Sequence, residues 1–155
     1  MPFLRDWAFL LVDDNPAALS MLRSMLLMLG IKAPHEAMDG ASAMELVSGH
    51  EFDCIITDVR MEPMSGAEFV RWVRHRNEAA NTTVRILAMS AYRDAAELAA
   101  LEAEGANGFI GKPLSVLFLQ KALEALATDP DHFVELESTA NAGQPTIIRR
   151  VSSKK

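Results

Sequence analysis

The chain has 155 residues and a formal net charge of −6 at pH 7, with 50% hydrophobic and 23% charged residues. This length suits one domain with a single core, and the negative charge disfavours non-specific nucleic-acid binding through a basic surface. One cysteine excludes a disulfide within the chain, and no apolar run approaches the roughly 20 residues of a membrane span. Because the N-terminus also lacks a signal-peptide pattern, we expect a soluble, cytoplasmic protein without membrane insertion.

The first two predicted strands differ in strength. Residues 7–12 are continuously apolar, which is typical of a central parallel strand buried on both faces. Asn15 and Pro16 are of the types preferred at the N-cap and first position of a helix, which we expect to run to Leu29. Residues 31–37 form a weaker strand that contains a proline, so we predict it at an edge of the sheet.

The third strand ends on a carboxylate. Residues 54–57 form a short apolar run that suits a buried strand, and it leads directly to Asp58 and a loop rich in turn residues. A helix over 41–48 precedes this strand, and a helix from Gly66 to about residue 76 follows it. The single cysteine, Cys54, lies inside the run, where a packing role is favoured over a reactive thiol.

Two more strand–helix units complete the predicted domain. Residues 84–89 form a fourth strand that ends at Ser90, and residues 94–103 a helix. A short fifth strand over 108–111 ends at Lys112, and the last helix covers about 114–127. Five strands alternating with five helices indicate an α/β fold, in which a parallel sheet carries helices on both faces.

The chain changes character after this alternation. We predict one domain over residues 1–127 and a polar C-terminal tail over 128–155, in which acidic residues precede a polar stretch and four basic residues. The tail is too short for a second domain, and its composition favours a flexible segment. Residues 146–148 are apolar enough to pack against the domain.

Reactive groups stand at four of the predicted strand ends. These are Asp13 and Asp14, Asp58, Ser90 and Lys112. In an open α/β sheet chemistry takes place beyond the carboxyl ends of the strands, so the groups should converge. Three close carboxylates repel one another unless a hard cation binds between them, and Mg²⁺ suits few carboxylates together with a phosphate oxygen. Lysine and serine can hold further phosphoryl oxygens, so the set predicts phosphoryl transfer.

Each of these residues has a simpler interpretation on its own. An aspartate at this position could cap a helix, a serine could close a turn, and a lysine could be a surface charge. The occurrence of all of them at the ends of four predicted strands favours the joint functional interpretation.

The combined motif resembles the receiver domain of two-component response regulators, in particular the stand-alone chemotaxis type, over about residues 7–127. The residues that carry the resemblance are Asp13, Asp14, Asp58, Met61, Pro63, Met64, Gly66, Ser90, Ala91, Phe109, Lys112 and Pro113. It implies a flavodoxin-like, doubly wound, five-stranded parallel sheet of order 2-1-3-4-5 with five helices. Two departures are Glu62, inserted before the proline of the loop, and Phe109 in place of a frequent tyrosine.

The resemblance also implies a phosphoacceptor chemistry. Asp58 would take a phosphoryl group from a histidine kinase or a histidine phosphotransfer protein, assisted by Lys112 and Ser90. Asp13, Asp14, Asp58 and the backbone carbonyl of Arg60 would form the Mg²⁺ site, with Asp13 acting mostly through water. The bond between residues 112 and 113 would be cis.

The same resemblance assigns a switch and a lifetime control. Ser90 and Phe109 would be the switch pair and would change the surface formed by residues 94–103, 108–111 and 114–127, which a downstream protein target reads. Arg60 and Tyr92, two places after the acceptor and the switch hydroxyl, would border the approach of the hydrolytic water. Both are large and neither orients water well, so we expect slow self-dephosphorylation.

Our leading hypothesis is a single-domain response regulator that is a phosphoacceptor switch, not an enzyme, and that binds proteins and not nucleic acid. One alternative is a Mg²⁺-dependent phosphatase with an aspartyl nucleophile, although Arg60 stands where such enzymes carry an acid/base aspartate. Others are a phosphorelay shuttle in place of a terminal effector, and a phosphorylation-independent scaffold.

The helix after Pro16 carries more apolar residues than one core stripe needs. Leu22, Met25, Leu26 and Leu29 make a stripe at helical spacing, which Met21 extends. Leu19 and Leu27 lie on another face. They are either solitary exposed leucines or a docking surface for the kinase.

Overall fold

Strands that are buried on both faces form the centre of the sheet. The computed structural model describes residues 2–76, 83–112, 114–138 and 145–152. β1 (Phe9–Val12) and β3 (Cys54–Asp58) are buried along their whole length, as their continuous apolar sequences predicted. Desolvation raises the pKa of the Cys54 thiol, which agrees with a packing role for this residue. β2 (His35–Ala37) pairs with β1 at one edge of the sheet, as expected of the weaker strand.

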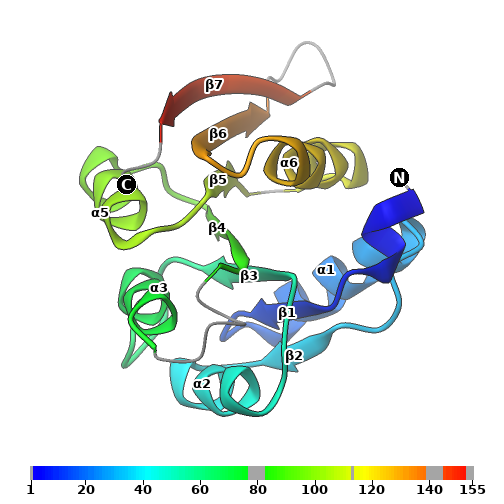
Figure 1. Cartoon of the computed structure of the whole chain (residues 1–155), viewed down its shortest axis with the longest axis vertical. Coiled ribbons are helices and arrows are strands. Elements are labelled where there is room, and N and C mark those ends of the chain that lie inside the picture. Colours follow the sequence, from blue (N-terminus) through cyan, green and yellow to red (C-terminus); the bar gives the residue numbers. More distant parts are fainter. Residues whose placement is uncertain (1, 77–82, 113, 139–144, 153–155) are drawn as a thin grey trace.

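Helices cover both faces of the sheet (Figure 1). The described residues contain five α-helices, which are α1 (Pro16–Met28), α2 (Gly40–Gly49), α3 (Gly66–Arg74), α5 (Ala95–Glu104) and α6 (Val116–Thr128). A 3-10 helix, η1 (Pro2–Asp6), precedes β1. One core lies between the sheet and helices α1 and α6, and a second lies between the sheet and helices α2, α3 and α5. None of the helices in the described ranges is long and apolar enough to cross a membrane.

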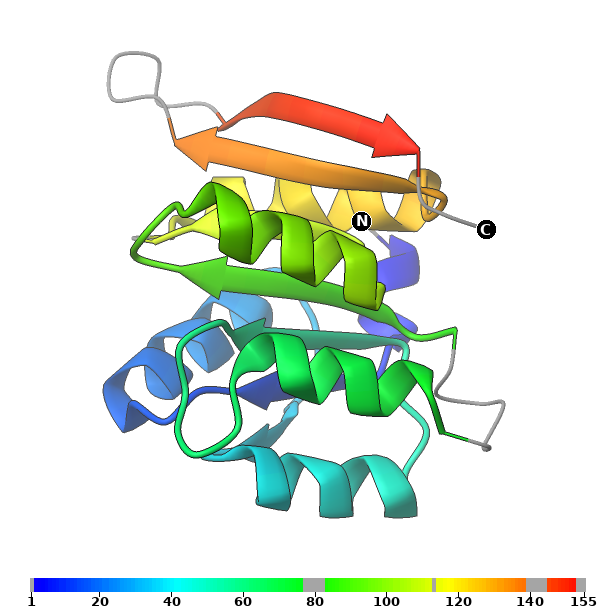
Figure 2. The same ribbon diagram turned by 90° about the vertical axis from the view of Figure 1, so that its left-hand side faces the viewer.

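The sheet contains the predicted order and extends beyond it. β4 (Arg85–Ser90) and β5 (Gly108–Gly111) follow β3 in parallel, which gives the order β2-β1-β3-β4-β5. β6 (His132–Ser138) then pairs in parallel with β5, and β7 (Pro145–Ser152) pairs antiparallel with β6. Figure 2 shows this terminal pair at the top of the molecule, above helix α5. The five predicted strands are therefore joined by two that the sequence analysis did not assign.

β6 differs from the flexible tail predicted from residue 128. Its side chains alternate between the two cores: Phe133 joins the core beside α5, and Val134 and Leu136 join the core beside α6. All three are buried. The apolar residues 146–148 are part of β7. The acidic residues of this segment made it resemble a polar tail, whereas in the structure it pairs with β5 and β7.

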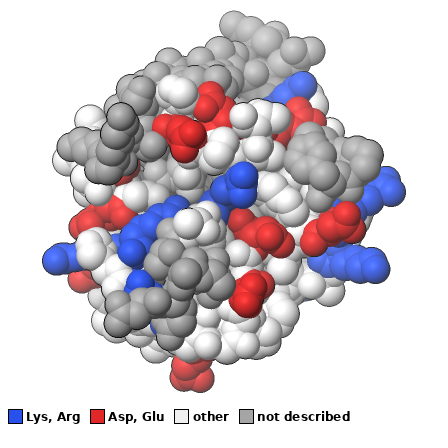
Figure 3. Space-filling model, viewed as in Figure 1, with Lys and Arg blue, Asp and Glu red and all other residues white. Residues whose placement is uncertain are grey.

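The charged surface is mixed on the face shown in Figure 3. Among the described residues drawn there, lysine and arginine side chains are interspersed with aspartate and glutamate. Both signs of charge are therefore available on this face to a protein partner.

Truncation of Phe133 tests whether β6 belongs to the folded core. The side chain is 1% exposed, so Phe133→Ala should lower the free energy of unfolding by about 3–5 kcal/mol. Met28→Ala provides the control, because Met28 is 73% exposed and its loss should change stability by no more than about 0.5 kcal/mol. Urea denaturation followed by circular dichroism measures both, and equal midpoints would show that β6 contributes nothing to the core.

Candidate functional site

The parallel arrangement of β1, β3, β4 and β5 brings the predicted reactive groups together at the carboxyl-terminal ends of these strands, which we call the site edge. Asp58 is the last residue of β3, and Ser90 is the last residue of β4. Asp13 directly follows β1 and Lys112 directly follows β5. The backbone N–H of Lys112 donates to the carbonyl oxygen of Ser90 at 2.8 Å, so neighbouring strand ends are tied together at the site.

Three carboxylates form a compact acidic cluster at this edge. One carboxylate oxygen from each of Asp13, Asp14 and Asp58 lies within 4.8 Å of the other two. Asp13 and Asp58 are buried, whereas Asp14 is exposed, so the cluster is accessible from solvent on one side. An all-oxygen donor set with an open side fits Mg²⁺, which keeps several of its waters when it binds to proteins.

Lys112 compensates part of the negative charge. Its Nζ donates to Oδ2 of Asp13 at 3.0 Å and to Oδ1 of Asp58 at 3.1 Å. Burial, followed by the charge of Asp13, raises the pKa of Asp58, and Lys112 opposes both effects. Partial burial alone would lower the pKa of Lys112, but its hydrogen bonds and the charges of Asp13 and Asp58 together raise it. The lysine therefore remains a cation beside the Asp58 carboxylate.

Gly66 allows helix α3 to begin against the end of β3 at Asp58. A Cβ atom at this position would lie 2.4 Å from the carbonyl oxygen of Asp58 and 2.9 Å from Cα of Val59. Both atoms belong to the backbone and cannot rotate away, so a side chain here would displace the end of β3. The N–H of Gly66 also donates to the carbonyl oxygen of Val59 at 2.9 Å, which fixes the loop after Asp58.

Comparisons with known proteins identify the family of the chain. The family model described as "Response regulator receiver domain" matches residues 9–124. The chain belongs to this receiver family.

Receivers that stand alone and receivers within longer proteins are both among its relatives. The chemotaxis protein CheY of Pseudomonas aeruginosa is 30% identical over 117 residues, which cover 76% of this chain and 93% of that protein. Stress response regulator protein 1 of Lodderomyces elongisporus is 30% identical over 116 residues, which cover 74% of this chain and 32% of that protein. The structure of the chemotaxis response regulator CheY4 of Vibrio cholerae has a TM-score of 0.71 at 30% identity and covers 77% of this chain and 98% of its own.

The two predicted switch residues occupy different environments in this receiver. Ser90 is buried at the site edge, and its Oγ accepts a hydrogen bond from the backbone N–H of Tyr92 at 3.1 Å. Phe109 lies in the middle of β5 and is 4% exposed, packed in the core beside α5. The cis bond predicted before residue 113 involves a residue outside the described ranges. Within those ranges the one cis peptide bond joins Glu62 to Pro63.

The residues expected to control lifetime contact each other. The guanidinium carbon of Arg60 lies 4.7 Å from the ring centroid of Tyr92, and its Nη2 is 3.2 Å from Oε1 of Glu97. Both side chains are at least half exposed above the site edge. They interact with each other, so they are not independent side chains extended into solvent.

Helix α1 is rotated relative to the prediction. Leu19, expected on a separate outer face, is 3% exposed and belongs to the core, whereas Met21, expected in the core stripe, is 57% exposed. Leu27 is exposed as predicted. The stripe is thus centred on Leu22 and Leu26, because α1 packs against both the sheet and α6. The spacing alone did not determine which flank of the stripe faces solvent.

An apolar groove of about 370 Å³ lies beside the acidic cluster. Met21, Leu22 and Met25 of α1 form one wall, and Lys112 and Leu114 contribute to the other. Met28, which is also exposed on α1, does not line the groove. The docking surface predicted on this helix consisted of Leu19 and Leu27, but neither residue lines the groove.

β6 also changes the surface that the resemblance assigned to the output of the switch. β5 is paired on both sides, because its residues Gly108–Ile110 are in register with Val134–Leu136 of β6. The predicted order 2-1-3-4-5 leaves this strand at the edge of the sheet. In the structure, β6 separates β5 from any partner that approaches the edge.

Proposed function

We propose that this receiver is a phosphorylation switch in which Asp58 accepts a phosphoryl group from a histidine kinase or a histidine phosphotransfer protein in a Mg²⁺-dependent reaction. The observation that carries the proposal is the shared position of Lys112, whose Nζ hydrogen-bonds both Asp13 and Asp58. A cation at this place can pair with the Asp58 carboxylate before transfer and with a phosphoryl oxygen after it.

The transfer step needs a nucleophile and charge neutralisation. A carboxylate oxygen of Asp58 forms the new bond to phosphorus, while the bond between phosphorus and the donor's imidazole nitrogen breaks and its electron pair returns to the ring. Asp13, Asp14, Asp58 and the carbonyl of Arg60 would hold Mg²⁺, which neutralises phosphoryl oxygens when it is bound. Lys112 and the Ser90 hydroxyl would bind the remaining oxygens.

The signal would then leave through a conformational change. When the Ser90 hydroxyl turns to the phosphoryl group, it gives up its hydrogen bond to the N–H of Tyr92, and the loop between β4 and α5 is released. Phosphorylation thereby shifts the population of a two-state loop, and a protein partner reads the altered surface.

The apolar groove beside the site is our proposed docking surface for the phosphodonor protein. Its apolar wall on α1 lies next to Lys112, so a donor that rests in it presents its phosphohistidine close to Asp58. A small phosphodonor needs no such surface. Labelling by a small donor therefore reports the chemistry at Asp58 alone, whereas transfer from a protein donor also reports docking.

Asp58→Asn should abolish labelling by a small phosphodonor such as acetyl phosphate in the presence of Mg²⁺. The wild type should gain one phosphate that is stable in acid and labile in base, as expected of an acyl phosphate, and a phosphate-affinity gel detects it. Asp14→Asn should weaken Mg²⁺ binding and raise the Mg²⁺ concentration needed for half-maximal labelling. Unchanged labelling of the Asp58→Asn protein would reject Asp58 as the acceptor.

Met21→Glu should impair phosphoryl transfer from a histidine kinase that labels the wild type, by about tenfold or more, because it places a charge in the apolar groove. Labelling by acetyl phosphate should stay unchanged. Met28→Glu is the matched control, since it adds the same charge to the same helix outside the groove. Equal transfer to both variants would show that the donor does not dock here.

Arg60→Asn combined with Tyr92→Glu should speed loss of the phosphoryl group. Arg60 lies over the ring of Tyr92, and we expect this pair to border the approach to Asp58 and to hinder the in-line water that hydrolysis requires. The measurement follows the decay of labelled protein after the donor is removed, with wild-type decay expected over minutes or longer. A double variant that decays no faster than the wild type would remove these side chains from any role in lifetime.

A further inference from the structure

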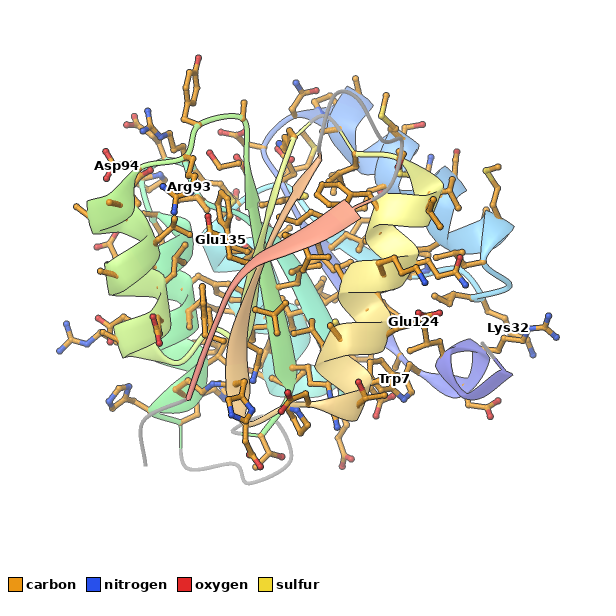
Figure 4. The ribbon with its side chains drawn as sticks, turned by 90° about the horizontal axis from the view of Figure 1, so that it is seen from above. Trp7, Lys32, Arg93, Asp94, Glu124 and Glu135 are labelled. Atoms are coloured by element: carbon orange, nitrogen blue, oxygen red, sulfur yellow. The ribbon has the colours of Figure 1, made fainter. Side chains whose placement is uncertain are left out.

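A buried carboxylate on the added strand is paired with the loop that the switch must move. Glu135 of β6 is 0% exposed, and Arg93 lies in the loop between β4 and α5, three residues after Ser90. The Nε and Nη2 atoms of Arg93 contact the two carboxylate oxygens of Glu135, and the Nη2–Oε1 distance is 3.2 Å. Figure 4 shows the two labelled side chains extending toward each other from the loop and the strand.

Glu135 also sits beside the aromatic switch residue. Its register partner on β5 is Phe109. Phe109 and Phe133 pack in the core beside α5, and alternation along β6 directs residue 135 to the same face as residue 133. The carboxylate is therefore next to both elements that the proposed switch uses: the β4–α5 loop and the ring of Phe109.

A continuous set of contacts joins the acceptor edge to β6. The Ser90 Oγ holds the N–H of Tyr92, the next residue is Arg93, and Arg93 forms a two-point ion pair with Glu135. An arginine that meets both oxygens of a carboxylate is restricted in distance and orientation, so the loop can move only a little before these bonds break. Separating a guanidinium from a buried carboxylate is unfavourable, which opposes the displacement of the loop.

We infer that the Arg93–Glu135 ion pair is a latch by which the added strand holds the β4–α5 loop in its unphosphorylated position and so sets the threshold of the switch. This inference rests on the proposed phosphorylation of Asp58. Linkage makes the effect reciprocal: a latch that opposes activation must be weakened when the phosphoryl group binds. Occupation of the site should therefore loosen β6, and loss of the latch should favour occupation.

The experiment measures the affinity of the Mg²⁺-loaded protein for beryllofluoride, an acyl-phosphate mimic, by titration calorimetry. Arg93→Ala and Glu135→Gln should each bind it about three- to tenfold more tightly than the wild type, a modest coupling because Arg93 is half exposed. The double variant should be no tighter than either single variant, because the two residues act through one interaction.

Arg23→Ala is the matched control. It removes another arginine–glutamate ion pair, between Arg23 of α1 and the partly exposed Glu36 of β2 at the opposite edge of the sheet, and should leave the affinity unchanged. Hydrogen exchange supplies an independent measurement: beryllofluoride should speed exchange of the amides of residues 133–136 in the wild type and have less effect in Arg93→Ala.

Each outcome separates the latch from the proposed function. Absence of beryllofluoride binding to the wild type would reject the phosphoacceptor site itself. Wild-type binding with equal or weaker binding by Arg93→Ala and Glu135→Gln would reject the latch alone. Additive effects in the double variant, or a gain of affinity in Arg23→Ala, would also reject it, because the effect would not then come from this ion pair.

Discussion

One ammonium group shared by two carboxylates holds together the carboxyl-terminal ends of three strands of this sheet. Asp13 and Asp58 are both buried and would repel each other across the ends of β1 and β3, and Lys112 bridges them from the end of β5. The arrangement requires three parallel strands to end at the same level, which the register of the sheet provides. The chemistry proposed for Asp58 thus depends on the strand order as much as on the residues themselves.

Much of this edge could be predicted because its determinants are local. Apolar runs mark the strands, and the first polar residue after each run falls at the carboxyl end, where parallel strands converge. Asn15 also caps α1 as its residue type indicated, accepting hydrogen bonds from the N–H groups of Ala17 and Ala18. Side-chain distances within the cluster were beyond sequence reasoning, since they depend on register and on the path of the loops.

The errors arose where distant parts of the chain determine the structure. Met21 and Leu19 exchanged roles because the rotation of α1 depends on its contacts with α6, far along the chain. β6 was missed because Glu135 interrupts its apolar pattern and makes the segment resemble a polar tail. The signal that could have identified it is the alternation of Val134 and Leu136 about that glutamate, but a strand there also needs the neighbouring strands β5 and β7 with which it pairs.

Glu135 also has a consequence for how the chain finds its pairing. A slip of β6 by one residue along β5 would turn the carboxylate toward α6, into the core that Val134 and Leu136 now fill, and would separate it from Arg93. An apolar residue at this position would be tolerated on either face, whereas a charged one is tolerated on only one. The buried glutamate thereby disfavours this one-residue slip of the last parallel strand, although it contributes little hydrophobic stabilisation.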